Sequence, residues 1–327
     1  MKDKKNLKKK IILAAILVAV FGAMAAVAFD ETYIALMFCR FGIYTIAVSG
    51  LDLLFGYTGQ ISFGHAAFFA VGAYTSAYFA INLNWNPVLT ILLGAVFSMV
   101  VGAVIAIPAT KLVKHFLSLL TIAFGQLVYT FANSTRPITG GASGLKDIPS
   151  ISVFGFSFDT YAKSFVLIFV LTVLLTIVKN NIVKSRVGRA FMAIRENTQA
   201  AYSSGINVRM YKTLAFIISA GYAGIAGGLY AHLFNFISPD TFSSTQSTLF
   251  MTILLFGGMA NLAGPLVGSV VLLCLKEFLQ SFSTYKMMVY ALLILVVLFL
   301  LPNGVTGIFK TATTKMKQLM VRRKNNA

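Results

Sequence analysis

The chain has 327 residues, of which 58% are hydrophobic and only 11% are charged. A soluble globular domain carries about 25% charged residues, so this chain cannot cover a water-exposed surface of its own size and must be surrounded largely by lipid. This excludes a disordered protein, a secreted disulfide scaffold and a cytosolic enzyme. The net charge of +18 is clustered at the two ends and in one loop. Orientation in a membrane explains that pattern better than nucleic-acid binding, and no nucleic-acid partner is expected.

Apolar runs long enough to cross a membrane occur ten times along the chain. A helix needs about 20 such residues to span the hydrocarbon layer, within a range of about 17–25. The expected fold is therefore all-α, a polytopic transmembrane helical bundle of about 8–10 spans. The candidates are roughly 11–29, 33–55, 63–81, 87–109, 115–132, 164–178, 213–233, 248–262, 265–281 and 286–301.

Some of these runs have alternative interpretations. Lysines, a 19-residue apolar stretch and Ala26-Val27-Ala28 imitate a cleavable signal peptide. The stretch exceeds the roughly 7–15 residues of a signal core, which favours a retained first span. The runs 248–262 and 164–178 are short, and the two runs around Gly264-Pro265 are alternatively one broken element.

Basic residues orient the spans, because cytoplasmic segments carry an excess of Lys and Arg. With an even number of spans and the N-terminus inside, 21 of the 27 basic residues fall on the cytoplasmic side and only four fall outside. The chain then divides into a basic cytoplasmic tail (1–10), a transmembrane domain (11–305) and a second basic cytoplasmic tail (306–327). Within the domain, loop 179–212 is cytoplasmic and loop 133–163 is external.

Four ionisable residues lie inside apolar runs: Arg40, Asp52, Lys276 and Glu277. Each costs roughly 2.5–3.5 kcal/mol at a helix centre, but all four lie nearer a span end, where snorkelling reduces that cost. Arg40 and Asp52 are about 18 Å apart along one helix and cannot pair within it. No proton relay is predicted from them.

The segment from Gly56 to His65, with the sequence GYTGQISFGH, interrupts two apolar runs without any charged residue. Its glycines and polar side chains do not make a stable lipid-facing helix, and non-helical backbone at membrane depth needs protein or a water cavity to cover it. Such breaks often line transport routes; a plain cytoplasmic turn is the alternative. On the fifth run, Thr121 and Gln126 either face a polar interior or bond to nearby backbone. The candidate residues of a translocation pathway or gate are Gly59, Gln60, Ser62, His65 and Gln126.

The sequence shows no constellation of catalytic residues. His65 has no Cys, His, Asp or Glu at ligand spacing, so no metal site is expected, and a hydrogen-bonded packing histidine is the alternative to a pathway residue. The glycine-rich stretch Gly140–Gly144 lacks the Gly-Lys-Ser/Thr ending of a nucleotide-binding loop. Small residues recur at helical spacing and predict close helix packing. They are Ala66, Ala70, Ala73 and Ala77, and then Ala220, Gly224 and Gly228.

The predicted cytoplasmic loop contains a short helical pattern, from Gln199 onwards, that Gly205 ends. It suits docking in a groove of a cytoplasmic partner; a solvated basic loop that only fixes topology is the alternative. The pattern Gln199-Ala200-Ala201, three residues and Gly205 resembles the loop by which permeases of ATP-binding-cassette importers dock on their ATPase. That loop has Glu where this chain has Gln199, and its distal hydrophobic-Pro part is missing here.

Further motifs resemble one branch of those permeases, the branched-chain amino acid permeases, and in particular the M-type membrane subunit of the high-affinity importers. The resemblance covers roughly residues 35–305. The motifs are Gly56 to Phe68, Thr139-Gly140-Gly141, Gly188-Arg189-Ala190 to Asn207-Val208, Tyr211 to Ala231, Gly257-Gly258 and Gly264-Pro265.

The resemblance implies a permease subunit that forms half of a translocation pathway and is not an enzyme. The implied partners are a second related permease subunit in a heterodimer, two cytoplasmic ATP-binding subunits, an external solute-binding protein and membrane lipid. The partner subunits bind ATP, so no cofactor is expected in this chain. The implied location is the plasma membrane of a prokaryote (cell inner membrane), with both termini cytoplasmic. The residues implied in coupling to the ATPase are Arg195, Glu196, Gln199, Ala200, Ala201 and Gly205.

The implied substrates are leucine, isoleucine and valine, while relatives of the family handle urea, short amides and other amino acids. From the residues alone, a stand-alone channel or a secondary carrier is the alternative function. An ion-coupled carrier usually has buried ionisable residues that face its site. In this sequence such residues are few, and their positions near span ends predict a peripheral location.

Overall fold

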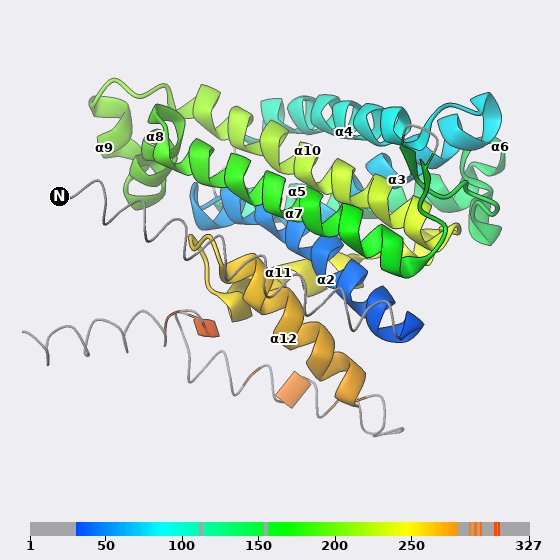
Figure 1. Ribbon diagram of the computed structural model, residues 1–327. Coiled ribbons are helices and arrows are strands. Elements are labelled where there is room, and N and C mark those ends of the chain that lie inside the picture. The colour runs from blue at the N-terminus through cyan, green and yellow to red at the C-terminus, as the bar shows by residue number, and fades with distance from the viewer. Residues whose placement is uncertain are drawn as a thin grey trace, which may run out of the picture.

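The computed structural model describes residues 31–110, 114–153 and 156–279, with a few isolated positions between 288 and 307. Within these residues the fold is an all-α bundle of eleven α-helices with one minimal β-hairpin (Figure 1). Six of the described helices are long and apolar enough to cross a membrane. The predicted fold class is confirmed. The predicted spans 11–29 and 286–301 and the two basic tails lie wholly or largely outside the described residues.

The six long helices come mainly from the first two thirds of the chain. They are α2 (Thr32–Leu51, continued by a π-helical turn over Asp52–Gly56), α3 (His65–Leu83), α4 (Pro87–Ala109), α5 (Lys114–Ser134), α7 (Tyr161–Lys184) and α10 (Val208–Phe234). The shorter helices are α6 (Arg136–Thr139), α8 (Arg186–Glu196), α9 (Thr198–Ser203), α11 (Ser244–Gly257) and α12 (Gly264–Phe278). Single 3₁₀ turns occupy Gly141–Ser143 and Pro239–Phe242, and β1 (Ser152–Val153) pairs antiparallel with β2 (Phe156–Ser157).

Helices α3, α4 and α10 form the tightly packed centre of the bundle, as the spacing of small residues predicts. A Cβ added to Gly72 would lie 2.3 Å from the carbonyl oxygen of Gly224, and one added to Gly227 would lie 2.0 Å from that of Phe69. Backbone groups cannot turn away from such a contact as a side chain can. The glycines therefore let the helix backbones approach directly, which is how helices pack in the absence of a hydrophobic drive between them.

The two predicted spans 248–262 and 265–281 are instead a hairpin of short helices, α11 and α12. Their 14 and 15 residues make helices of about 21–23 Å, less than the roughly 30 Å of the hydrocarbon core. Residues 258–263 break the apolar run, with positive φ angles of 103° at Gly258 and 52° at Ala260. The prediction of two full spans is wrong, and the alternative of one broken element fits the structure.

The two large connections lie at opposite ends of the bundle. Helices α8 and α9 occupy one end, and α6 occupies the other (Figure 1). At the α6 end, the backbone of Leu145 forms a two-way bridge with Ile237, and His232 Nδ1 donates to the carbonyl oxygen of Pro149 at 2.7 Å. These bonds tie the connection between α6 and α7 to the end of α10. Which end faces the cytoplasm stays a prediction from the basic residues.

Candidate functional site

The non-helical segment between α2 and α3, residues 57–64, is covered by protein. The chain leaves α2 through the π-helical turn and crosses Gly59 with a positive φ of 71°. Thr58, Gln60 and Ser62 are all buried, with exposures of 3%, 3% and 0%. This burial meets the condition under which irregular backbone persists at membrane depth. A role of Gly59, Gln60 and Ser62 in a pathway or gate stays a prediction, with a plain turn as the alternative.

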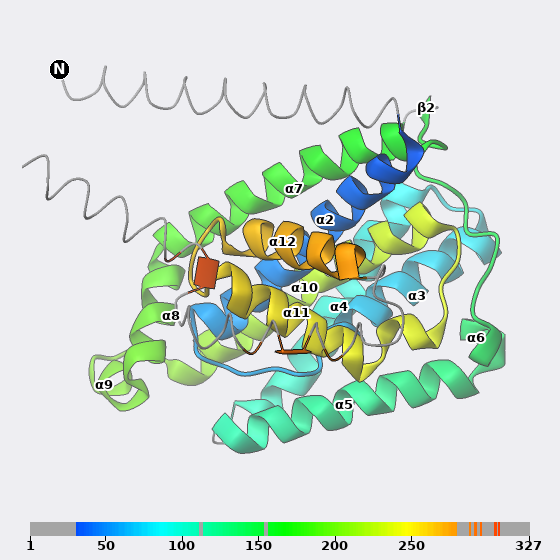
Figure 2. The same cartoon turned by 90° about the horizontal axis from the view of Figure 1, so that it is seen from below.

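The segment also connects helices that are distant in the sequence. Gln60 Nε2 donates to the carbonyl oxygen of Lys212 in α10 at 3.3 Å, and the backbone N–H of Phe63 donates to Thr121 Oγ1 in α5 at 3.1 Å. Figure 2 shows the segment crossing the bundle from the α8 end towards α5. The segment is therefore hydrogen-bonded to both α5 and α10.

His65 is completely buried at the start of α3. Its Nε2 donates to the carbonyl oxygen of Ala47 in α2 at 2.8 Å, since a carbonyl oxygen can only accept. The ring also packs edge-on against Phe68 and Phe250. These contacts describe the packing histidine of the alternative interpretation, and a pathway role for His65 stays a prediction.

Three polar atoms of the predicted pathway lack a hydrogen-bond partner within the described part of the chain. They are Gln60 Oε1, Ser62 Oγ and His65 Nδ1. The great majority of buried polar atoms in folded proteins are paired. A polar group that reached any of these three atoms would give it a hydrogen-bond partner.

Gln126 does not join the other predicted pathway residues. It lies exposed on the outer face of α5, next to Leu127 and Thr130, beside an open hollow of about 630 Å³. Thr121, on the same helix, is buried, and its hydroxyl donates to the carbonyl oxygen of Ser118 at 2.9 Å. The alternative of bonding to neighbouring backbone is therefore confirmed for Thr121. Gln126 lines a pathway only if another subunit closes this face.

Helices α8 and α9 are both started by side-chain caps. Ser185 accepts from the N–H of Val187 at the start of α8, and Asn197 accepts from the N–H groups of Gln199 and Ala200 at the start of α9. Such caps satisfy N–H groups that a helix end leaves unpaired. Gly205 ends α9 with a φ of 80°, the left-handed conformation that favours glycine. The predicted short helix and its glycine stop are confirmed.

The predicted coupling residues divide into exposed and internal ones. Glu196, Gln199, Ala200 and Gly205 are exposed, and Tyr202 between them is 69% exposed. Ala201 is buried within the chain at 4% exposure. The outer face of α9 therefore presents Gln199, Ala200 and Tyr202, and Tyr202 is a surface residue that the sequence pattern did not single out.

Arg195, the remaining predicted coupling residue, reaches inward from the last turn of α8. Its Nη1 donates to the carbonyl oxygen of Gly56 at 2.5 Å, and its side chain lies against Gly59. Two regions that the sequence predicts separately, the coupling loop and the α2–α3 segment, thus meet at Arg195.

A buried ion pair that the sequence pattern does not predict lies next to this contact. Asp52 Oδ2 and Lys179 Nζ are 2.7 Å apart, with both side chains fully buried. Lys179 therefore lies inside α7 and not at the start of a cytoplasmic loop, and Asp52 does not snorkel. An isolated charge in a span needs a partner, but the sequence does not show that the helix continues past Lys179 and so encloses this charge.

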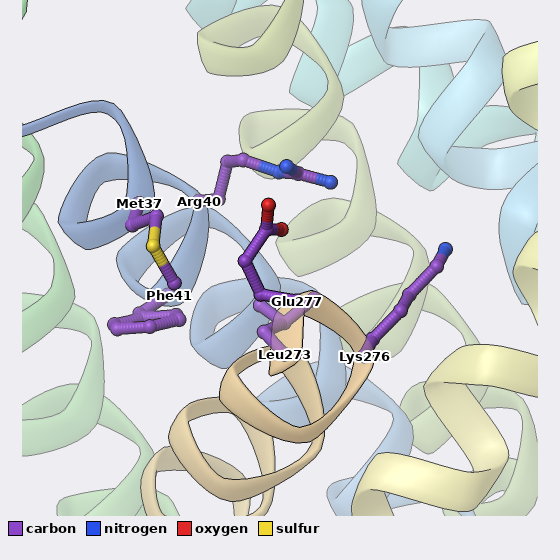
Figure 3. Close-up of a pocket in the computed structure, with 6 residues that line it drawn as sticks. All are labelled: Met37, Arg40, Phe41, Leu273, Lys276 and Glu277. Carbon is purple, nitrogen blue, oxygen red and sulfur yellow. The ribbon is translucent and has the colours of Figure 1, made fainter. Parts of the chain in front are cut away.

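Arg40, in the first half of α2, lies near Lys276 and Glu277 of α12, and the Lys276 side chain points away from Glu277 (Figure 3). With Met37, Phe41 and Leu273 they line a hollow between α2 and α12 (Figure 3). The Tyr33 hydroxyl donates to the Glu277 carboxylate. The cavity of about 10 Å³ is near the minimum that holds one water molecule. An amino-acid substrate does not fit it in this conformation.

Comparisons with known proteins agree with the fold and with the motifs. The family model of the branched-chain amino acid transport system permease component matches residues 33–298. The chain is 28% identical to the high-affinity branched-chain amino acid transport system permease protein LivM of Salmonella typhimurium, over 92% of this chain and 76% of the relative. It is 23% identical to the probable LivM of Methanocaldococcus jannaschii, over 87% and 96%.

A second group of relatives carries a different subunit name. The permease protein LivH of Salmonella typhimurium is 24% identical, over 81% of this chain and 91% of the relative. No solved structure matches the chain. The family model covers most of the chain, including all six long helices and the α11–α12 hairpin. The chain therefore belongs to the family of branched-chain amino acid transport permeases, which are non-catalytic transport subunits of ATP-binding-cassette transporters.

Proposed function

We propose that this chain is an M-type permease subunit of an importer for branched-chain amino acids, driven by cytoplasmic ATPases. The observation that carries the proposal is the pair α8–α9 in a chain of this family: a capped helix pair at one end of the bundle, with an exposed face and an arginine that reaches the spans. Such a pair of helices gives the ATPases a surface to bind, and Arg195 connects that surface to the spans.

The proposed assembly contains this chain, a second related permease, two ATP-binding subunits that bind the ATP, and an external solute-binding protein. It lies in the plasma membrane of a prokaryote, with both termini of this chain cytoplasmic. The similarity to relatives named LivM and LivH supports a pair of related but different permeases. The second permease would also close the α5 face that carries Gln126.

The face of α5 supports this pairing by its composition. Gln126, Thr130 and Ser134 lie on it among apolar residues, beside the open hollow. The outer face of α4, by contrast, is uniformly apolar at its exposed positions Leu92 and Val96. A polar amide on a lipid-facing surface costs free energy. The α5 face therefore suits a protein neighbour and a polar route better than it suits lipid.

Leucine, isoleucine and valine are the proposed substrates, from the family and from the names of the relatives. The test is uptake of labelled leucine by the reconstituted assembly with its purified binding protein, in competition with isoleucine, valine, urea and short amides. Competition by isoleucine and valine alone supports the proposal. Uptake of urea or an amide, with no effect of leucine, would assign another small substrate to the same machinery.

A further inference from the structure

One carboxylate joins three elements at the end of α2 near α8. Asp52 Oδ2 accepts from Lys179 Nζ in α7 at 2.7 Å. The other oxygen, Oδ1, accepts from the backbone N–H of Ala260 at 2.8 Å, in the loop between α11 and α12. The end of α2, α7 and the α11–α12 hairpin thus share one buried contact.

The local backbone is shaped around this carboxylate. Asp52 begins the π-helical turn and Gly56 ends it. A Cβ on Gly56 would lie 1.9 Å from Asp52 Oδ1 and 2.8 Å from the Ala260 nitrogen, so only glycine leaves room for the contact. Single π-helical turns of this kind often occur at functional sites.

Helix α8 is attached to the same turn. Arg195 donates to the carbonyl oxygen of Gly56, the residue whose Cα faces Asp52 and Ala260. A movement of the last turn of α8 therefore acts on the backbone that holds the carboxylate. This connection runs through Gly56 and does not depend on residues 57–64.

The two helices of the hairpin on the far side of the carboxylate are packed closely against each other. A Cβ on Gly257 would lie 1.9 Å from the carbonyl oxygen of Gly264, and one on Gly268 would lie 2.1 Å from that of Ile253. The last turn of α11 and the first turn of α12, which flank the loop, are thus in backbone contact. Packed elements of this kind shift between discrete arrangements and do not deform continuously.

Stability alone does not explain a buried ion pair, because a well-packed apolar pair of similar volume often gives the same or a higher free energy of unfolding. Its distinguishing property is sensitivity to geometry, since both charges lose their partner if the elements separate. We propose that Asp52 and Lys179 are positioning residues that transmit movement of α8 to the α11–α12 hairpin during the transport cycle. The inference rests on the proposed function, in which α8 and α9 receive the ATPases.

The test uses the assembled transporter with the double variant Asp52→Asn/Lys179→Met, which removes both charges and keeps an oxygen for Ala260. Lys184→Met is the matched control, a lysine near the end of the same helix. We expect the double variant to bind the ATPases as the wild type does, and the assembly to hydrolyse ATP at the wild-type rate. Its leucine uptake per ATP falls about tenfold, a typical size for coupling between sites. Lys184→Met leaves that ratio unchanged.

A second readout needs no transported substrate. Ala263→Cys is placed in the hairpin loop of a chain that carries Cys39→Ala and Cys274→Ser, and its labelling rate is compared with and without ATP and vanadate. A nucleotide-dependent change in rate is expected in the wild-type background and is lost in the double variant. If the double variant assembles and keeps both the uptake ratio and the labelling change, the pair is only structural and the inference is overturned.

Arg195→Gln keeps the test decisive if the double variant fails to assemble. Arg195 is only partly buried, so its loss spares the core, and it should remove the labelling change at position 263. If Arg195→Gln kept that change, the proposed transmission from α8 to the α11–α12 hairpin would be contradicted. Failure of the wild-type assembly to take up leucine, with the labelling change intact, would instead contradict the proposed substrate alone.

Discussion

Two glycines of the α2–α3 segment differ in the room around them. A Cβ on Gly64 would lie 2.3 Å from the backbone oxygen of Thr121, whereas one on Gly59 would meet only the Arg195 side chain, at 3.5 Å. Gly59 has a positive φ and Gly64 does not. The free-energy cost of a side chain at Gly59 is therefore conformational. The cost of a side chain at Gly64 comes from its collision with the backbone of α5.

We expect Gly64→Ala to destabilise the protein more than Gly59→Ala. A left-handed residue with a side chain costs about 1–2 kcal/mol, while α5 has to shift before Gly64→Ala can be accommodated. Thermal unfolding in detergent measures the difference, with Gly205→Ala as a control in which strain occurs without a nearby atom. Equal melting temperatures for Gly59→Ala and Gly64→Ala would contradict the close approach of α3 and α5.

The Asp52–Lys179 pair predicts a specific pattern of stabilities. Removing one member of a buried ion pair typically costs about 3–5 kcal/mol, because the other charge is left buried without a partner, whereas neutralising both is often nearly neutral. Lys179→Met alone should therefore lower the melting temperature strongly, and Asp52→Asn should recover most of the loss. A double variant no more stable than Lys179→Met would show that the two charges do not interact.

At the scale of elements, the long spans could be predicted because their apolar runs are nearly uninterrupted. The α11–α12 hairpin could be predicted only as an alternative to two spans, since apolar composition does not distinguish a short internal helix from a span. The short helix α9 and its stop at Gly205 could be predicted because they depend on local residues, whereas the Ser185 and Asn197 caps are not predicted. The Asp52–Lys179 pair joins residues 127 positions apart, and no local pattern encodes such a contact.

The outer face of α9 predicts how docking is lost. Tyr202→Asp would place a charge on the exposed face while the buried Ala201 keeps the helix in place. We expect the ATPases to dissociate from this variant during purification while the permease still inserts. Phe156→Asp is the control, an exposed aromatic residue at the opposite end of the bundle. ATPases retained by Tyr202→Asp, or lost equally from Phe156→Asp, would contradict docking on α9.

At the scale of the whole molecule, the two ends of the bundle should react with different compartments. In a chain with Cys39→Ala and Cys274→Ser, a membrane-impermeant maleimide added to intact cells should label Ser157→Cys and spare Ser203→Cys. Both positions are exposed in the structure, so access to the reagent decides the result. Labelling of Ser203→Cys from outside would invert the predicted topology.

ATP hydrolysis by partner subunits is proposed to drive transport through this chain. The most direct test of this proposal is uptake of labelled leucine into proteoliposomes that contain the complete assembly, with the binding protein outside and ATP trapped inside. We expect uptake that requires ATP, the ATPases and the binding protein. An imposed proton or sodium gradient should not replace ATP. Uptake by this chain alone, driven by such a gradient, would contradict the proposal.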